Sequence, residues 1–192
     1  MNGKPAKVLG VTAMRQAIRV ACQQRHAIRN KAIVLLSFKA GLRAGEIAAL
    51  KWEMILDATG RVGRFIELPA CVAKKGSGRR IPIGPELTTA LRLLLRQQHT
   101  WEGPVIRSSR GRHMTAKALV NWFTALYRTA GFEGCSSHSG RRNFVTRAAR
   151  LITKAGGSLR DVQQLVGHRS IQTTQGYIEG DAQAQHRLIR MI

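Results

Sequence analysis

The chain has 192 residues, 44% of them hydrophobic, which is typical of one well-packed globular domain. Its 32 lysines and arginines stand against 10 acidic residues, and the resulting net charge of +22 predicts a nucleic-acid partner bound by a folded domain with a basic face. The longest apolar run covers only residues 32–38, which is too short to span a membrane, and residues 1–10 lack the apolar core of a secretory signal. The three cysteines match neither a zinc site nor a disulfide framework, so a reducing cytoplasm is expected.

The first part of the chain predicts three helices. Thr12 is a candidate cap for a helix over residues 13–25, in which apolar residues recur at helical spacing. A second, mostly buried helix follows and ends at Gly41, which is predicted to be its C′ glycine. The stretch "AGEIAALKW" predicts a short third helix.

Residues 57–83 change in character, because four glycines divide them into short segments. The segments "FIELPACVA" and "RRIPI" predict short strands joined by a basic turn. We therefore expect one small antiparallel sheet, of three strands, on an edge of the molecule.

Helices are predicted again from Pro85 onward, and proline suits the first helical position. Thr115 is a candidate cap, and Ser158 with Asp161 resembles a capping box. The predicted helices cover residues 86–98, 116–130, 139–155, 159–166 and 181–190. The sequence thus predicts a mainly α fold with a small antiparallel β-sheet (α+β).

The acidic residues exclude several kinds of phosphate chemistry. Metal-dependent nucleases and polymerases gather carboxylates around magnesium, and the ten acids here form no recognisable metal motif. No P-loop and no glycine-rich dinucleotide loop occurs either. We therefore expect no metal and no nucleotide cofactor.

Attack on a phosphodiester without a metal needs a protein nucleophile, cationic groups on the phosphate and a proton donor for the leaving oxygen. Arginine forks bind two phosphate oxygens at once, and histidine or lysine can move protons. Four segments supply such groups: "GLRAGEIAALKW", "AKKGSGRRIPI", "HSGRRNFVTRA" and "LVGHRSIQTTQGYI".

In this order, the four segments resemble the tyrosine recombinases, also called the phage integrase family. That family has an arginine in a "GLR…E…L" box, a lysine in a β-hairpin, an "HxxR" pair and a "GH" box, with the nucleophilic tyrosine nine residues after the histidine of that box. Each element is present here, and the resemblance runs from about Leu9 to the C-terminus. It implies the catalytic-domain fold of these DNA breaking and rejoining enzymes.

The resemblance also implies a role for each matching residue. Arg43 and Arg141 would bind the non-bridging oxygens of the scissile phosphate. Tyr177 would attack, giving a 3′-phosphotyrosyl link and a free 5′-hydroxyl. His168 would donate a hydrogen bond to the phosphate, and His138 would assist proton transfer near the tyrosine.

A hairpin lysine would protonate the leaving 5′-oxygen. Lys74 is preferred because it lies eight residues before Pro82, the spacing usual in the family, and Lys75 is the alternative. The chain departs from the family beside its second arginine, where leucine and histidine are common and Gly140 and Arg142 stand here. The glycine is expected to loosen the start of the helix that aims Arg141.

Length is the larger departure. Most relatives carry an N-terminal core-binding domain that completes a clamp around DNA, whereas residues 1–192 match a single catalytic domain with an N-terminal extension over residues 1–10. The chain resembles short, single-domain members such as fimbrial-switch invertases, and a truncated integrase copy is an equal alternative. Residues 178–192 are a candidate helical tail for docking on a neighbouring protomer.

The implied partner is double-stranded DNA, bound by a homotetramer, with a monomer in solution left open and no membrane partner. Six further residues are candidate DNA contacts: Lys75, Arg79, Arg80, Arg110, Arg112 and Arg142. Two alternatives to recombination remain open at this point. One is a type IB topoisomerase-like activity that relaxes supercoils, and the other is a DNA-binding protein of the same fold with little turnover.

Overall fold

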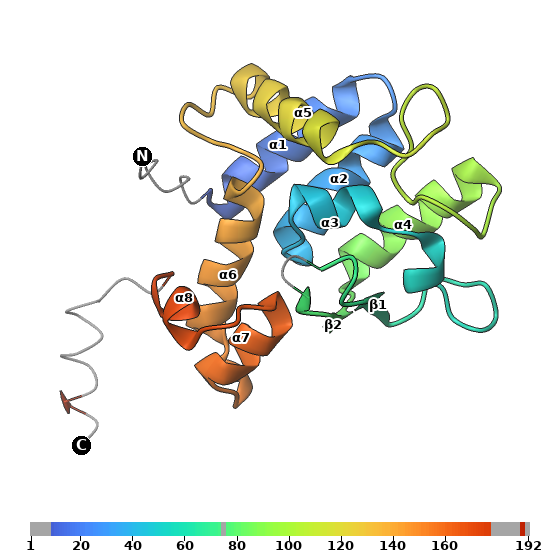
Figure 1. Cartoon of the computed structure of the whole chain (residues 1–192). Helices are drawn as coiled ribbons and strands as arrows, with labels where there is room; N and C mark the ends of the chain where they lie inside the picture. Colours follow the sequence, from blue (N-terminus) through green and yellow to red (C-terminus); the bar gives the residue numbers. More distant parts are fainter. Residues whose placement is uncertain (1–8, 74–75, 178–188, 191–192) are drawn as a thin grey trace.

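The computed structural model describes residues 9–73, 76–177, 189 and 190 and is mainly helical (Figure 1). Its elements follow in chain order: α1 Val11–Gln23, α2 Ala27–Lys39, α3 Ala44–Ala49, η1 Trp52–Met54, β1 Phe65–Leu68, β2 Arg79–Pro82, α4 Pro85–Gln98, α5 Ala116–Thr129, α6 Ser139–Leu151, η3 Thr153–Ala155, α7 Leu159–Val166 and α8 Ile171–Gln175. The labels η1 and η3 mark short 3-10 helices.

Helix α2 lies at the centre of the core, because its sequence is apolar on every side. Residues 32–36 have no exposed surface, and helices α1, α3, α4 and α6 all contact α2. Figure 1 shows α1 and α5 on one side of it, α4 and the β1–β2 hairpin on the other, and α6 to α8 extending from one end. Burial of each large aliphatic side chain stabilises the fold by roughly 1.5–3 kcal/mol.

The sheet has two strands among the described residues, so the prediction of three is wrong. Strands β1 and β2 pair antiparallel, with Ile66 opposite Ile81 and Glu67 opposite Arg80. Before β1, Leu56 and Val62 form an isolated bridge and no ladder. The intervening residues form a turn in which the Asp57 side chain accepts hydrogen bonds from backbone N–H groups, and the chain therefore reverses before a ladder can extend.

Several predicted helix ends are confirmed. Pro85 begins α4, Thr115 caps α5 by accepting from the backbone N of Ala118 at 3.2 Å, and Ser158 with Asp161 forms the capping box of α7. Gly41 follows α2 with φ of 64°, a conformation that favours glycine.

Other boundaries differ from the prediction. Helix α1 begins at Val11 and is preceded by Gly10, not capped by Thr12, because the Met14 backbone N already donates to the Gly10 carbonyl at 3.0 Å. Helix α6 ends at Leu151, four residues before the expected end, and the chain tightens into η3 before Gly156 at φ of 77°. The helix expected over residues 181–190 lies almost entirely outside the described residues.

The C-terminal end has a small core of its own. Val145 and Ala149 of α6 pack against Val162 and Val166 of α7, and Tyr177 packs against this group. The segment after α8 is thereby held against α6 and α7, and α7 also contacts β2. This arrangement brings the last predicted site residues next to the hairpin.

Candidate active site

Arg43 stands at the N-cap of α3, directly after the turn at Gly41. Glu46, three residues on, is 1% exposed and accepts a hydrogen bond from the Arg43 backbone N at 2.9 Å and another from its guanidinium at 2.8 Å. The same carboxylate therefore caps the helix and orients the Arg43 side chain, which remains 20% exposed.

Arg79 is the second partner of Glu46. Its Nη1 and Nη2 donate to the two carboxylate oxygens at 3.1 and 2.9 Å, and its side chain is only 4% exposed. Burial would raise the pKa of Glu46, but the hydrogen bonds and charges of Arg79 and Arg43 outweigh it and lower that pKa to about 2.

This position differs from the predicted contact between Arg79 and the DNA backbone. Strand residues alternate between faces, so β2 turns Arg79 and Ile81 inward and Arg80 toward solvent. Arg80 is 62% exposed, forms an ion pair with Glu67 and lies 3.8 Å from the centre of the Phe65 ring. Arg79 therefore stabilises the site from inside, whereas Arg80 keeps a surface position.

Arg141 is the third residue of α6 and is 3% exposed. Its guanidinium donates to the carbonyl oxygens of Gly41 at 2.5 Å and of Val166 at 2.7 Å, which ties α6 to the Arg43 turn and to the end of α7. Burial, followed by the positive charge of Arg43, lowers the pKa of Arg141 to about 9. The guanidinium remains largely charged at neutral pH and has further N–H groups for a ligand.

Gly140 does not loosen this helix start. A Cβ at Gly140 would lie 2.8 Å from ring atoms of Phe38 in α2 and would also meet the Ser37 hydroxyl. The glycine allows α6 to pack directly against α2, and this contact positions the first turn that carries Arg141.

His168 follows Gly167, which ends α7 in the left-handed conformation with φ of 65°. His168 is 9% exposed, and its ring Nδ1 lies 3.0 Å from the Thr174 hydroxyl. Gln163 donates to the His168 carbonyl at 2.9 Å. Burial, followed by the positive charges of Arg141, Arg43 and Arg79, lowers the pKa of His168 to about 4. The imidazole is therefore neutral at pH 7.

Tyr177 lies beside this histidine. The rings of Tyr177 and His168 are stacked with centroids 5.7 Å apart, and the Arg142 guanidinium is 5.5 Å from the Tyr177 ring centre. Tyr177 is half-buried against the small C-terminal core. The structure thus gathers Arg43, Arg141, His168 and Tyr177 from three separate parts of the chain.

A pocket of about 300 Å³ opens at this cluster. Its lining residues are Arg43, Ser77, Gly167, His168, Arg169, Ser170 and Thr173. A water takes about 30 Å³ in the liquid, so this space is large enough for a phosphodiester group with several waters. Arg43 and His168 are two of the hydrogen-bond donors that line it.

The other predicted site residues lie outside this cluster or outside the described residues. His138 is exposed at the N-cap of α6, one turn before Arg141. Lys74 and Lys75 lie outside the described residues, in the part of the sequence between β1 and β2. Arg110 and Arg112 are exposed on the turn closed by the bridge between Arg107 and His113.

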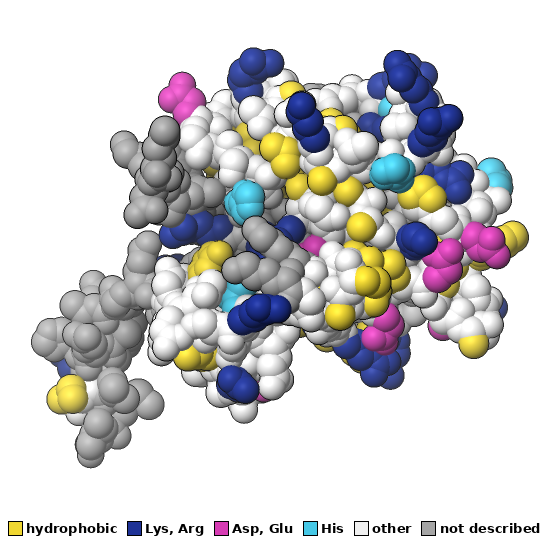
Figure 2. Space-filling view, in the orientation of Figure 1, with side chains coloured by type: hydrophobic (Ala, Val, Ile, Leu, Met, Phe, Trp, Pro, Cys, Tyr) yellow, Lys and Arg dark blue, Asp and Glu magenta, His cyan; other side chains and the backbone are white. Residues whose placement is uncertain are grey.

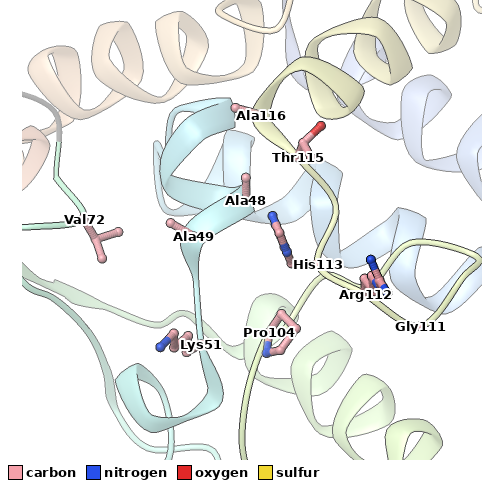
Figure 3. A pocket seen from close by; sticks show the side chains of 10 residues that line it. All are labelled: Ala48, Ala49, Lys51, Val72, Pro104, Gly111, Arg112, His113, Thr115 and Ala116. Atoms are coloured by element: carbon pink, nitrogen blue, oxygen red, sulfur yellow. The ribbon is translucent and has the colours of Figure 1, made fainter.

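Arg112 also lines a separate pocket of about 680 Å³ between α3 and the start of α5 (Figure 3). Figure 2 shows that lysine and arginine side chains form separate groups over one face of the protein. The positive charge is therefore spread over that face, and the buried Glu46 network is a distinct feature beneath the surface.

Sequence reasoning omitted two buried residues from the site, Glu46 and Thr174. A signal for Glu46 existed, because an acid three residues after a helix start is typical of a capping box. Thr174 gave no comparable signal, since its contact with His168 depends on how α8 folds back. No group of three or more His, Cys, Asp or Glu side chains suited to a metal ion occurs within the described ranges.

A family model described as the phage integrase family matches residues 7–184, nearly the whole chain. The chain therefore belongs to the phage integrase family, the tyrosine recombinases, as the motifs of the sequence had predicted. Among the residues that the structure describes, no helix is both long and apolar enough to cross a lipid bilayer.

Individual relatives agree with this assignment. The tyrosine recombinase XerC of Xanthomonas campestris is 29% identical over 189 residues, covering 94% of this chain and 53% of that relative. XerC of Shewanella amazonensis is 32% identical over 162 residues, covering 82% of this chain and 51% of that relative. The chain thus spans about half the length of the curated relatives that it matches.

Solved structures share the fold. A crystal structure of XerA recombinase superposes with a TM-score of 0.75 at 23% identity, covering 98% of this chain and 66% of that one. A lambda integrase dimer bound to a COC′ core site gives 0.70 at 19% identity, covering 94% and 51%. The prediction of a mainly helical recombinase catalytic domain with a small antiparallel sheet is confirmed.

Proposed function

We propose that this chain is a site-specific DNA recombinase that cleaves and rejoins strands through Tyr177, without metal or ATP. The observation that carries the proposal is that Arg43 and His168 line one pocket, that the buried Arg141 lies within electrostatic range of both, and that the Tyr177 ring is stacked on His168. Membership of the tyrosine recombinases supports the same chemistry.

In the proposed reaction, the arginines hold the scissile phosphate through its non-bridging oxygens. Arg43 reaches the pocket directly, and the remaining N–H groups of Arg141 serve the phosphate as its charge redistributes. His168 is neutral, so it contributes one N–H to the same phosphate.

The Tyr177 oxygen attacks phosphorus and the bond to the 5′-oxygen breaks, leaving a 3′-phosphotyrosyl link. A tyrosine hydroxyl with a pKa of about 10 is only about one part in a thousand ionised at pH 7, so its proton must pass to an acceptor as the new bond forms. We assign that acceptor role to His138. Lys74, with Lys75 as the alternative, gives a proton to the leaving 5′-oxygen.

Rejoining reverses these steps. A 5′-hydroxyl attacks the phosphotyrosyl phosphorus, the tyrosine leaves, and the protons return to their first carriers. The phosphotyrosyl link conserves the free energy of the broken phosphodiester bond, so no nucleotide hydrolysis is required. Exchange between two duplexes needs four strand cleavages, and we therefore propose that four copies act together on DNA.

The test uses a pool of substrates, so the target site need not be known. Nicked suicide duplexes of randomised sequence are incubated with the protein, and covalent adducts are isolated from a denaturing gel and sequenced. We expect a recurrent sequence in the wild-type adducts. Tyr177→Phe should abolish the adduct. The matched control is Tyr127→Phe, a packing position that is 1% exposed, which should retain the adduct.

Other outcomes separate the alternatives. Relaxation of any supercoiled plasmid, with adducts at unrelated sequences, would favour a type IB topoisomerase-like activity. Tight DNA binding with no adduct in the wild type would favour a DNA-binding protein of this fold. Either result would overturn the recombinase proposal.

A further inference from the structure

The hydroxyl group of Thr174 contacts the imidazole of His168 inside the protein. Its Oγ1 lies 3.0 Å from Nδ1, and both residues are buried, with Thr174 fully so. The same threonine accepts a hydrogen bond at its carbonyl from the Tyr177 backbone N at 3.1 Å. Thr174 therefore touches both His168 and the segment that carries the proposed nucleophile.

The state of the histidine makes this contact important. Burial and the surrounding arginines keep the imidazole neutral at pH 7, so it carries one proton on either Nδ1 or Nε2. Phosphate oxygens only accept hydrogen bonds, so a ring nitrogen without a proton would repel the scissile phosphate. The chemistry requires the proton on the nitrogen that faces the DNA.

A threonine hydroxyl can donate a hydrogen bond, so it can pair with an Nδ1 that has no proton, which a carbonyl or carboxylate oxygen cannot do. Once Nε2 carries the proton that a phosphate needs, Nδ1 has a lone pair, and the hydroxyl must donate to it. The burial of Thr174 removes competition from water, and its branched side chain restricts the rotamers open to Oγ1.

We propose that Thr174 is a positioning residue, which holds His168 in the tautomer that presents Nε2–H to the scissile phosphate. This inference rests on the proposed function and extends it, since it assigns the origin of the His168 proton. Thr174 acts through His168 and does not touch the DNA. Gln163 complements it by holding the His168 carbonyl from α7.

The structure offers a discriminating set of variants. Thr174→Val keeps the branched shape and removes the hydroxyl, and Thr174→Ser keeps the hydroxyl and removes the methyl group. Thr89→Val makes the same chemical change on α4, at an exposed threonine whose hydroxyl donates to the Pro85 carbonyl at 3.0 Å. It controls for the general effect of replacing a helical threonine by valine.

The first measurement is the rate of covalent adduct formation at saturating DNA. Thr174→Val should lower this rate roughly ten- to a hundred-fold, as is common when an orienting partner is lost, with little change in DNA affinity. Thr174→Ser should recover most of the rate, and Thr89→Val should match the wild type. An unchanged rate in a folded Thr174→Val protein would overturn the inference.

The second measurement reads the tautomer directly in the protein without DNA. Nitrogen-15 NMR of the histidine rings, assigned with His168→Gln, should show the proton of His168 on Nε2 in the wild type and in Thr174→Ser, and a tautomer mixture in Thr174→Val. A proton on Nδ1 in the wild type would contradict the inference. This readout is independent of adduct formation, so failure of the recombinase proposal and failure of the Thr174 role are distinguishable.

Discussion

Glu46 and Arg79 form a doubly hydrogen-bonded ion pair inside the protein, with N–O distances of 2.9 and 3.1 Å and side chains that are 2% and 4% exposed. The pair joins α3 to β2, and Glu46 also holds Arg43 at 2.8 Å. One carboxylate therefore forms ion pairs with two guanidinium groups next to the pocket. The position of Arg43 depends on this buried charge.

Replacing Glu46 by glutamine should destabilise the protein strongly. Removing one partner of a buried ion pair leaves an uncompensated charge and commonly costs about 3–5 kcal/mol. Urea denaturation measures the free energy of unfolding, and Glu67→Gln provides the control, because its pair with Arg80 is exposed and such pairs contribute about 0–1 kcal/mol. Equal losses in the two variants would contradict the network.

The free energy of unfolding should decrease as the pH falls from about 6.5 toward 4. The pKa of His168 is about 4 in the folded protein and about 6.5 when unfolded, so the unfolded state binds more protons in this window. The contribution of the neutral His168 to the free energy of unfolding is fully present above pH 6.5 and is lost as the pH falls through 4. Glu46 adds a second loss below pH 4.5, toward its folded pKa of about 2.

Comparison of unfolding free energies at pH 7 and pH 5 tests the histidine term. His168→Gln should show a smaller difference between the two pH values than the wild type. His113→Gln, at an exposed histidine, should retain the wild-type difference. The same pH difference in all three proteins would show that His168 is not buried in its neutral form.

Gly140→Ala should destabilise the protein by about 1–3 kcal/mol, because the new methyl group would overlap Phe38 and Ser37 of α2. The expected shift of α6 should also slow adduct formation through Arg141. Gly45→Ala is the matched control: its Cβ would meet nothing within 4 Å, so alanine should raise helix stability slightly. Thermal unfolding of both variants checks the contrast, and a neutral Gly140→Ala would contradict the packing argument.

Lys74→Ala should slow strand cleavage more than Lys75→Ala, if Lys74 protonates the leaving oxygen. A substrate with sulfur in the bridging 5′ position has a leaving group that needs no proton, so it should restore cleavage in the variant that lacks the general acid. Adduct rates on oxygen and sulfur substrates measure this rescue. Rescue of Lys75→Ala alone would move the role to Lys75.

Features that depend on residues close together in the sequence were predicted better than features that depend on distant segments. The Thr115 cap and the Ser158–Asp161 capping box depend on neighbours within three residues, and both were predicted correctly. The third expected strand is absent from the described residues, in which Leu56 and Val62 form one isolated bridge around a tight turn.

The interior of the site was less predictable, since it depends on contacts between distant segments. Arg79 looked like a surface residue, but its partner Glu46 is 33 positions away in the chain. The contact between Arg141 and the Gly41 carbonyl spans 100 positions. Motif spacing identified Arg43, Arg141, His168 and Tyr177, which the fold brings near one another, whereas their burial and partners required the structure.

The proposed reaction requires that Tyr177 becomes covalently linked to DNA. The most direct measurement is mass spectrometry of the peptide recovered after nuclease and protease digestion of the wild-type adduct. We expect a nucleotide joined through its 3′-phosphate to Tyr177, with a free 5′-hydroxyl on the released strand. A phosphate on another side chain, or an adduct that persists in Tyr177→Phe, would contradict it.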